Sequence, residues 1–350
     1  MQGERVVILG GGFAGIAAKL VYPNAILVDE KDFMVVTPRL VEVIEKNLPL
    51  SYALIHRKVD VKAKILKVDF KEKKVITTNG EIKFDKLIIA LGYEQDLSKI
   101  KGAENYGIGF TLENIEKIKS FKEGSVVTIL GGGALGVELA GALRKRGHIV
   151  NLVEAESRLL PYLVSDFSRE VQRVLENQGV NVILSAKVEE VNQNEVVTTQ
   201  GRIRSDYVIF SAGFSGPKII KEMALSNKNN RMLVDRYLRS IDYDFVYGAG
   251  DCANFKDGFI PQSAQVSLQA GEVAMNNAIK DEKVEFKPVQ RAIVLKIGED
   301  YIGLIKNTVI SGPIASFIKS FAISSLEGKV KKVNRLILAV FTRGVTSAYF

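Results

Sequence analysis

The sequence is poor in the side chains that bind metals or form disulfides. Its 350 residues include one cysteine, Cys252, and two histidines, His56 and His148. A single cysteine excludes an internal disulfide framework and any site built from several thiolates, and two histidines leave little for a metal. We therefore expect no metal site, and any redox chemistry has to come from an organic cofactor.

Two kinds of segment are also missing. The N-terminus lacks the pattern of a signal peptide, because ERVVILGGG leads directly into a strand-like segment. No apolar run approaches the roughly 20 residues that span a bilayer, and the longest near the C-terminus is LILAVF, Leu336 to Phe341. We expect a cytoplasmic chain that does not cross a membrane.

Charge is distributed unevenly along the chain. The formal net charge is +8, and residues 301–350 hold seven Lys or Arg residues against one acid, Glu327. This basic region could face anionic lipid or nucleic acid, or it could be a solvated surface. The remaining composition, 47% hydrophobic and 25% charged, is that of a globular protein with two or three domains.

An internal repeat organises the sequence. The segments VVILGGGFAGIAA and VVTILGGGALGVELA each combine an apolar β-branched run, a G-x-G-x-x-G motif and a small-residue helical stretch. The second copy follows the first at an offset of 121 positions, and the glycines are Gly10, Gly12 and Gly15, then Gly131, Gly133 and Gly136. KVITTNGEIKFDKLIIALGY and EVVTTQGRIRSDYVIFSAGF repeat the offset downstream. A period this long indicates two copies of a whole domain.

The repeat predicts the fold class. The continuous apolar runs KLIIALG and YVIFSAG are typical of parallel strands buried on both faces. The predicted class is α/β, with two Rossmann-like, doubly wound dinucleotide-binding domains and a short C-terminal helical segment.

Each copy also has an acid at the end of its second strand, where a carboxylate accepts hydrogen bonds from an adenosine ribose. In the second copy this acid is Glu154, 18 positions after Gly136. A carboxylate there repels a 2′-phosphate and favours NADH over NADPH, although Arg158 could partly compensate. In the first copy the candidates are Asp29 and Glu30. Asp29 is only 14 positions after Gly15, so the first crossover is about one helical turn short.

These motifs resemble the two-dinucleotide-binding-domain flavoproteins of the pyridine nucleotide–disulfide oxidoreductase superfamily over roughly residues 5–280. The resemblance implies FAD at the first motif and NAD(P)H at the second. FDKLIIALG and SDYVIFSAG, which end at Gly92 and Gly213, look like the strands that connect the two domains. FVYGAGDCA resembles the second FAD segment, with Asp251 at the flavin's ribitol or pyrophosphate, and PQSAQVSLQAGEVAMNNA resembles the helix under the flavin ring.

The resemblance gives expected domain boundaries. The FAD domain comprises residues 1–105 and 240–290, and the NAD(H) domain comprises residues 106–239. Residues 291–350 form the C-terminal segment.

The missing thiols select among the members of the superfamily. Disulfide reductases, coenzyme A disulfide reductases and sulfide:quinone oxidoreductases need cysteines that this chain lacks. DEKDFMVVTPRLVEV, GGGALGVELAGAL and AQVSLQAG are instead similar to type II NADH:quinone oxidoreductases. That similarity implies that Thr37 and Pro38 lie near the flavin and that Glu138 lies by the nicotinamide. It also implies that Gln265 and Gln269 border a quinone pocket. A structural salt bridge is the alternative for Glu138, and polar capping or surface exposure is the alternative for the glutamines.

The C-terminal segment has an amphipathic pattern. Ile314, Phe317, Ile318 and Phe321 recur with helical period. Farther on, Val333, Leu336, Ile337 and Val340 lie opposite Lys331, Lys332 and Arg335. An in-plane membrane anchor, a homodimer interface or a core-covering helix would each produce this pattern.

The function that follows is FAD-dependent oxidation of NADH with transfer of electrons to a membrane quinone, without proton pumping. The enzyme is expected on the inner face of the cell membrane, with no nucleic-acid partner. The alternatives are a soluble reductase of a ferredoxin or rubredoxin, and a flavoprotein like apoptosis-inducing factor with little turnover. Under each of these hypotheses, Cys252 is expected to be a small buried side chain that only fills space in the core.

Overall fold

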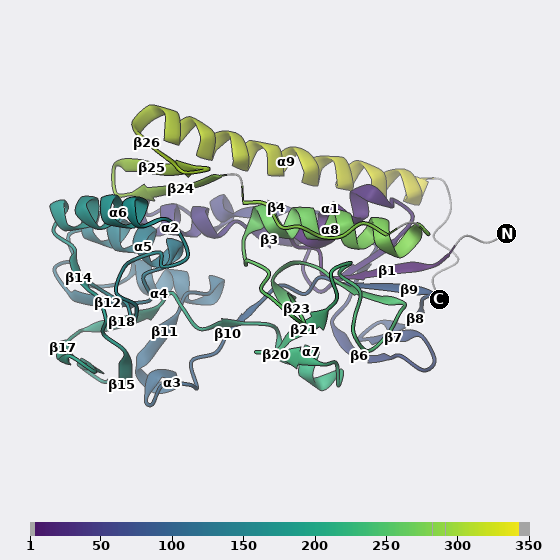
Figure 1. The fold of residues 1–350 in the computed structure, drawn as a ribbon, viewed down its shortest axis with the longest axis horizontal. Helices are drawn as coiled ribbons and strands as arrows, with labels where there is room; N and C mark the ends of the chain where they lie inside the picture. Colours follow the sequence, from purple (N-terminus) through teal and green to yellow (C-terminus); the bar gives the residue numbers. More distant parts are fainter. Residues whose placement is uncertain (1–3, 282, 291, 343–350) are drawn as a thin grey trace.

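The computed structural model describes residues 4–281, 283–290 and 292–342, and the side chains up to residue 337. Figure 1 shows two α/β halves side by side, with the C-terminal helix lying along the same edge of both. The first half contains the first glycine motif and the second half contains the other. The predicted fold class is confirmed.

A five-stranded parallel sheet forms the centre of the first half. Its order is β22-β9-β1-β2-β5, and all neighbours run parallel. The strands are β1 (Val6–Leu9), β2 (Ile26–Asp29), β5 (Val61–Lys62), β9 (Lys86–Ile89) and β22 (Val246–Gly248). Strand β22 follows all the strands of the second half in the sequence. The first half is therefore built from two separate stretches of chain.

The second half repeats this plan. Its parallel sheet has the order β11-β18-β12-β13-β14. The strands are β11 (Gly107–Gly109), β12 (Val126–Leu130), β13 (Ile149–Val153), β14 (Asn181–Ile183) and β18 (Tyr207–Phe210). The strand β9 of the first sheet and β18 of the second occupy corresponding positions at the offset of 121.

Each half also carries a small antiparallel meander. The first consists of β6 (Ile65–Asp69), β7 (Lys74–Thr77) and β8 (Gly80–Lys83). The second consists of β15 (Val188–Asn192), β16 (Glu195–Thr198) and β17 (Gly201–Arg204). The last two strands of each meander keep the offset residue by residue, as the repeat predicts.

Helices follow the glycine turns. The first turn leads into α1 (Phe13–Val21), which has 9 residues, and the second leads into α5 (Ala134–Lys145), which has 12. The first crossover is therefore short, as the position of its acid indicates. Helix α8 (Ala264–Ile279) packs closely on α1, since a Cβ on Gly271 would lie 2.0 Å from the carbonyl oxygen of Ala14.

Two short strands connect the halves. β10 (Glu94–Gln95) and β19 (Phe214–Ser215) pair antiparallel. β10 begins two residues after Gly92, which has a φ of +72°, and β19 begins directly after Gly213, which has a φ of +79°. The two crossings between the halves therefore lie against each other at the middle of the molecule.

The other elements fill the loops between these sheets. In the first half they include β3 (Phe33–Val35), β4 (Leu54–His56), α7 (Lys218–Glu222), β20 (Asn227–Lys228), β21 (Arg231–Val234), η3 (Gly250–Cys252) and β23 (Ala253–Phe255). Between β3 and β4 the chain forms α2 (Thr37–Lys46) and η1 (Leu50–Ala53), whose buried side chains pack in the core of the second half. In the second half they are α3 (Ala103–Tyr106), η2 (Leu112–Asn114), α4 (Ile115–Lys119) and α6 (Ser165–Asn177).

The C-terminal segment is a meander followed by one long helix. The meander, β24 (Ala292–Ile297), β25 (Asp300–Ile305) and β26 (Thr308–Ser311), is not anticipated by the helical pattern of the sequence. Helix α9 (Gly312–Thr342) then runs from the second half to the first (Figure 1). Within the described residues, no helix is both long enough and apolar enough to cross a bilayer.

The two halves of α9 differ in what they cover. Leu326, Val330, Val333 and Ile337 are buried in the core of the first half, so the core-covering alternative holds for this stretch. Leu336 is only half-buried, and the Val340 side chain lies outside the described residues. Near the start of the helix, the side chains of Ile314, Phe317 and Phe321 are 66%, 71% and 67% exposed, and Ile318 is half-buried.

Candidate functional site

The two glycine turns have nearly identical geometry. A Cβ on Gly15 would lie 1.9 Å from the carbonyl oxygen of Gly10, and a Cβ on Gly136 would lie 1.9 Å from that of Gly131. Gly10 and Gly131 both have positive φ, +95° and +117°. Only glycine at these positions lets each helix begin directly against its strand.

The middle glycine of each turn faces open space. Gly12 and Gly133 are the N-cap residues of α1 and α5, and a Cβ on either would meet no atom within 4 Å. Neither helix has a side-chain hydrogen bond at its cap. The free N–H groups and the positive end of each helix dipole therefore fit a dinucleotide diphosphate.

The predicted ribose acids lie at these turns. Asp29 Oδ2 accepts a hydrogen bond from the Gly11 N–H at 2.7 Å, and Glu154 Oε2 accepts one from the Gly132 N–H at 2.6 Å. Glu30, the other candidate, is exposed. Asp29 and Glu154 therefore lie at equivalent places, each at the end of the second strand of its sheet and against its glycine turn.

Asp251 lies in a polar corner with two buried side chains, those of Arg231 and Ser267. Ser267 Oγ of α8 donates to Asp251 Oδ1 at 3.2 Å, and Arg231 Nε donates to the Asp251 carbonyl at 2.9 Å. Burial raises the pKa of the Asp251 carboxyl, an effect that the Ser267 hydrogen bond and Arg231 partly offset. Ser263 caps the start of α8 by accepting from the Val266 N–H.

Tyr93 connects this corner with other predicted residues. It follows Gly92, and partial burial raises the pKa of its hydroxyl, an effect that the Thr37 side chain opposes and the Asp251 carboxyl adds to. Its ring contacts Phe214, the residue after Gly213, edge to face at 4.9 Å. Thr37 begins α2, with Pro38 in the first turn. Gly92 and Gly213 therefore each precede one member of an aromatic pair, and Thr37 and Asp251 both influence the pKa of its tyrosine.

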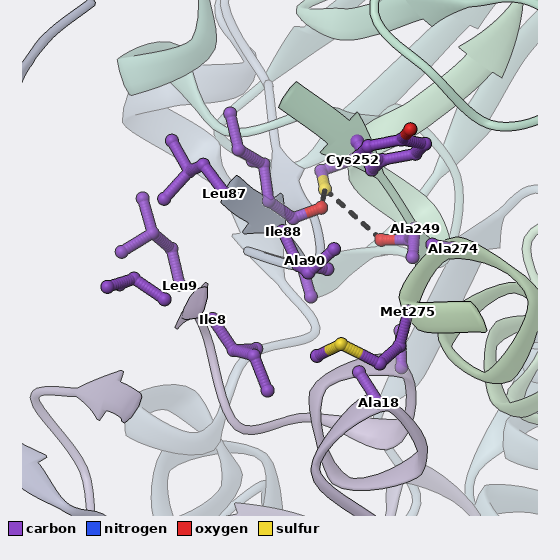
Figure 2. Packing of buried hydrophobic residues seen from close by; sticks show 14 of the residues in the cluster. Ile8, Leu9, Ala18, Leu87, Ile88, Ala90, Ala249, Cys252, Ala274 and Met275 are labelled. Atoms are coloured by element: carbon purple, nitrogen blue, oxygen red, sulfur yellow. Dashed lines mark hydrogen bonds between the residues drawn. The ribbon is translucent and has the colours of Figure 1, made fainter. Parts of the chain in front are cut away.

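The Cys252 side chain is packed in the core and is not exposed to solvent. Figure 2 shows the thiol among apolar side chains of β1, β9 and α8, and Sγ lies 3.4 Å from the carbonyl oxygens of Ile89 and Ala249. The residue is fully buried, and burial raises the thiol pKa to about 11. Because the thiolate is the reactive form, this cysteine is chemically inert at neutral pH.

Glu138 lies where three elements meet. It is buried on α5, accepts the Lys296 N–H of β24 at 2.8 Å, and forms an ion pair with Lys319 of α9. The neighbouring Lys296 Nζ pairs with Glu45 of α2. This ion pair is the salt-bridge alternative that the sequence leaves open for Glu138, and no local signal marks Lys319 as the partner, because the two residues are 181 positions apart.

The two glutamines of α8 lie one turn apart. Gln269 Nε2 donates to the Val289 carbonyl at 2.7 Å, and Gln269 Oε1 accepts the Val289 N–H at 3.1 Å. Gln269 Nε2 also approaches the Gln265 carbonyl at 3.2 Å. The Gln269 amide thus holds the segment around Val289 against α8, and any ligand that binds this amide has to replace those bonds.

Comparison with known proteins places the chain in a family. The model of the pyridine nucleotide-disulphide oxidoreductase family matches residues 4–271. The chain belongs to this family. The predicted superfamily is confirmed, and so is the prediction of an oxidoreductase that uses FAD and NADH.

Individual members of the family are also similar. A type II NADH:quinone oxidoreductase from Staphylococcus saprophyticus is 26% identical over 90% of this chain and 93% of its own length. The solved structure of an NDH2 from Plasmodium falciparum in complex with NADH has a TM-score of 0.80 at 15% identity, covering 97% of this chain and 98% of that one. The sulfide:quinone oxidoreductase of Aquifex aeolicus also reaches 0.80, at 17% identity, covering 95% of this chain and 92% of that one. The predicted resemblance to the type II enzymes is confirmed.

Proposed function

We propose that this protein is a peripheral membrane enzyme that oxidises NADH and passes the electrons through FAD to a quinone, without pumping protons. The observation that carries the proposal is the position of α9. This helix exposes Phe317 and Phe321, while Lys319, between them in sequence, is paired with buried Glu138. Helix α9 thus carries both an exposed apolar surface, Phe317 and Phe321, and the cation that pairs with Glu138.

The residues around the first turn would hold FAD. The diphosphate would lie at the open N–H groups of the turn and the adenosine ribose at Asp29, with Glu30 at the rim. The flavin end would lie toward the corner formed by Asp251. The proposed set is Gly10, Gly12, Gly15, Asp29, Glu30, Thr37, Pro38, Gly92 and Asp251. When bound, FAD supplies the two-electron chemistry between the nicotinamide and the quinone.

The second turn would hold NADH through Gly131, Gly133, Gly136, Glu154 and Gly213. The Glu154 carboxylate would accept hydrogen bonds from the ribose hydroxyls and would disfavour the 2′-phosphate of NADPH. We place Glu138 beside the nicotinamide and flavin, held by Lys319 and the Lys296 N–H. Gln265 and Gln269 would border the quinone pocket.

The activity is tested by steady-state oxidation of NADH with a short-chain quinone and with an oxidised ferredoxin as separate electron acceptors. We expect turnover with NADH and the quinone, and the same turnover in Cys252→Ala, because the thiol is buried and inert. Turnover with ferredoxin but not quinone would support the soluble reductase instead. Absence of turnover with every acceptor would support a binding role and overturn the proposal.

Membrane attachment is tested by co-sedimentation with anionic vesicles. The double variant Phe317→Ser/Phe321→Ser should bind at least about tenfold more weakly, since burying a large apolar side chain contributes about 1.5–3 kcal/mol. Leu66→Ser is the matched control. Leu66 is also exposed, but it lies on β6, on the opposite side of the molecule from α9 (Figure 1).

Two results would contradict the attachment. Unchanged vesicle binding by the double variant would show that this face of α9 is not the anchor. Absence of vesicle binding by the wild type, together with a dimer that the double variant loses, would assign the face to a homodimer. Vesicle binding by the wild type would place the enzyme at a membrane surface, for which we propose the inner face of the cell membrane.

A further inference from the structure

Arg57 is a buried cation directly beneath the first glycine turn. It follows strand β4, and its side chain is almost fully buried. Arg57 Nη2 donates to Asp29 Oδ2 at 2.8 Å, and Nη1 donates to the Lys31 carbonyl at 2.9 Å. No motif in the sequence marks this residue, because it is 28 positions from the acid that it contacts.

The guanidinium packs against the turn itself. A Cβ on Gly11 would lie 2.6 Å from Arg57 Cζ and 3.0 Å from Nε. At the equivalent position of the second copy, a Cβ on Gly132 would meet Leu159 Cδ2 at 2.6 Å. The first turn is therefore supported by a cation where the second is supported by a leucine.

This difference changes how each acid is held. Asp29 accepts the Gly11 N–H and, at its other oxygen, the Lys31 N–H at 2.9 Å. Glu154 accepts two matching backbone bonds, from Gly132 and from Glu156 at 2.9 Å. Within the described part of the chain, Asp29 adds an ion pair with a buried cation and Glu154 has no ion pair.

The segment that carries Arg57 is fixed on both sides. Asn334 of α9 accepts the Lys58 N–H at 2.7 Å and donates to the His56 carbonyl at 3.3 Å. The Arg57 N–H itself donates to the Asp32 carbonyl at 2.7 Å. The backbone therefore holds the guanidinium in place without help from a ligand.

One polar atom at this place has no partner among the described residues. Arg57 Nε is buried and makes no hydrogen bond. Leaving a buried donor of a charged group unsatisfied is unfavourable, so the position of this side chain is not explained by fold stability alone. A rigid site formed in advance instead favours ligand binding, because less ordering is required when the ligand arrives.

We propose that Arg57 is a positioning residue for the ADP half of FAD. By holding Asp29 and the Gly10–Gly12 turn in their binding geometry, it makes the first site retain its dinucleotide. The second site lacks this support and releases its dinucleotide during turnover. The inference rests on the proposed function only in that FAD occupies the first site.

The test measures FAD release from the intact holoenzyme. Purified protein is diluted stepwise, and free FAD is followed by its fluorescence to give a Kd. Arg57→Met should raise the FAD Kd at least tenfold, which corresponds to about 1.4 kcal/mol. The Kd for NAD⁺, which would occupy the second site without reducing the flavin, should stay within twofold when measured with excess FAD present. Arg57→Lys keeps the charge but loses the forked donor, so it should raise the FAD Kd at least about threefold.

Lys19→Met is the matched control. Lys19 forms a second buried ion pair of the same half, with Asp60 at 2.8 Å, but it lies at the far end of α1 from the turn. Its loss should lower stability like the loss of Arg57 while changing the FAD Kd less than twofold. A merely structural Arg57 would therefore behave like Lys19.

Three outcomes overturn the inference. The first is an FAD Kd within twofold of the wild type in a folded Arg57→Met. The second is an FAD Kd that rises as much in Lys19→Met as in Arg57→Met. The third is a Kd for NAD⁺ that rises as much as the FAD Kd in Arg57→Met. If Arg57→Met does not accumulate, a wild-type FAD Kd in Arg57→Lys overturns it as well. Failure of the proposed function is distinct, because it appears in the wild type as bound FAD without quinone turnover.

Discussion

Gly15→Ala and Gly136→Ala should each disable a different dinucleotide site. In both variants the added Cβ would lie 1.9 Å from a carbonyl oxygen of the same turn, so the helix has to move off its strand. Overpacking of this kind costs about 1–3 kcal/mol, which would weaken binding about fivefold to 150-fold. Gly15→Ala should be purified with little flavin. Gly136→Ala should keep its flavin spectrum but need far more NADH for bleaching.

The visible spectrum before and after NADH addition distinguishes the two variants. Gly328→Ala is the control, because Gly328 lies within α9 and a Cβ there would meet no atom within 4 Å. It should match the wild type in both flavin content and NADH response. The assignment of FAD to the first turn and NADH to the second would be wrong if Gly136→Ala lost flavin while Gly15→Ala retained it.

Glu138→Gln should destabilise the fold and detach α9 from the second half. The substitution leaves Lys319 largely buried without its carboxylate, and breaking a buried ion pair in this way costs about 3–5 kcal/mol. Urea denaturation should show this loss. Glu170→Gln is the matched control, because its partner Arg173 is largely exposed and such surface pairs contribute about 1 kcal/mol or less.

A double variant separates charge from packing. In Glu138→Leu/Lys319→Met both charges are absent, and replacing a buried pair by apolar residues is often neutral or stabilising. Its stability should therefore return close to that of the wild type. If the double variant also lost quinone turnover, the pair would have a role beyond holding α9. A Glu138→Gln variant as stable as the wild type would show that the ion pair does not contribute to the fold.

The sequence predicts much of the fold because the repeat is encoded locally. The two G-x-G-x-x-G turns, the apolar strands before them and the acids after them occupy short stretches whose spacing depends on backbone geometry. The short first crossover is also visible in sequence, since Asp29 follows its glycine too soon, and the structure shows a shorter α1.

Other features have no local signal. The meander at 292–311 lies in a segment for which the sequence analysis predicts only helix. The amphipathic pattern of α9 does not predict which of its apolar side chains the rest of the protein covers. In the structure, the core of the first half buries Val333 and Ile337, whereas Phe317 and Phe321 remain exposed beyond it.

The sequence by itself therefore determined the family plan, two dinucleotide turns and the absence of a working thiol, because each depends on residue types at fixed short spacings. Only the tertiary structure decided which distant charges meet. Arg57 reaches Asp29 across 28 positions, and Lys319 reaches Glu138 across 181. Such pairs form where separate elements pack together, so their partners are set by the three-dimensional arrangement of the chain and not by spacing along it.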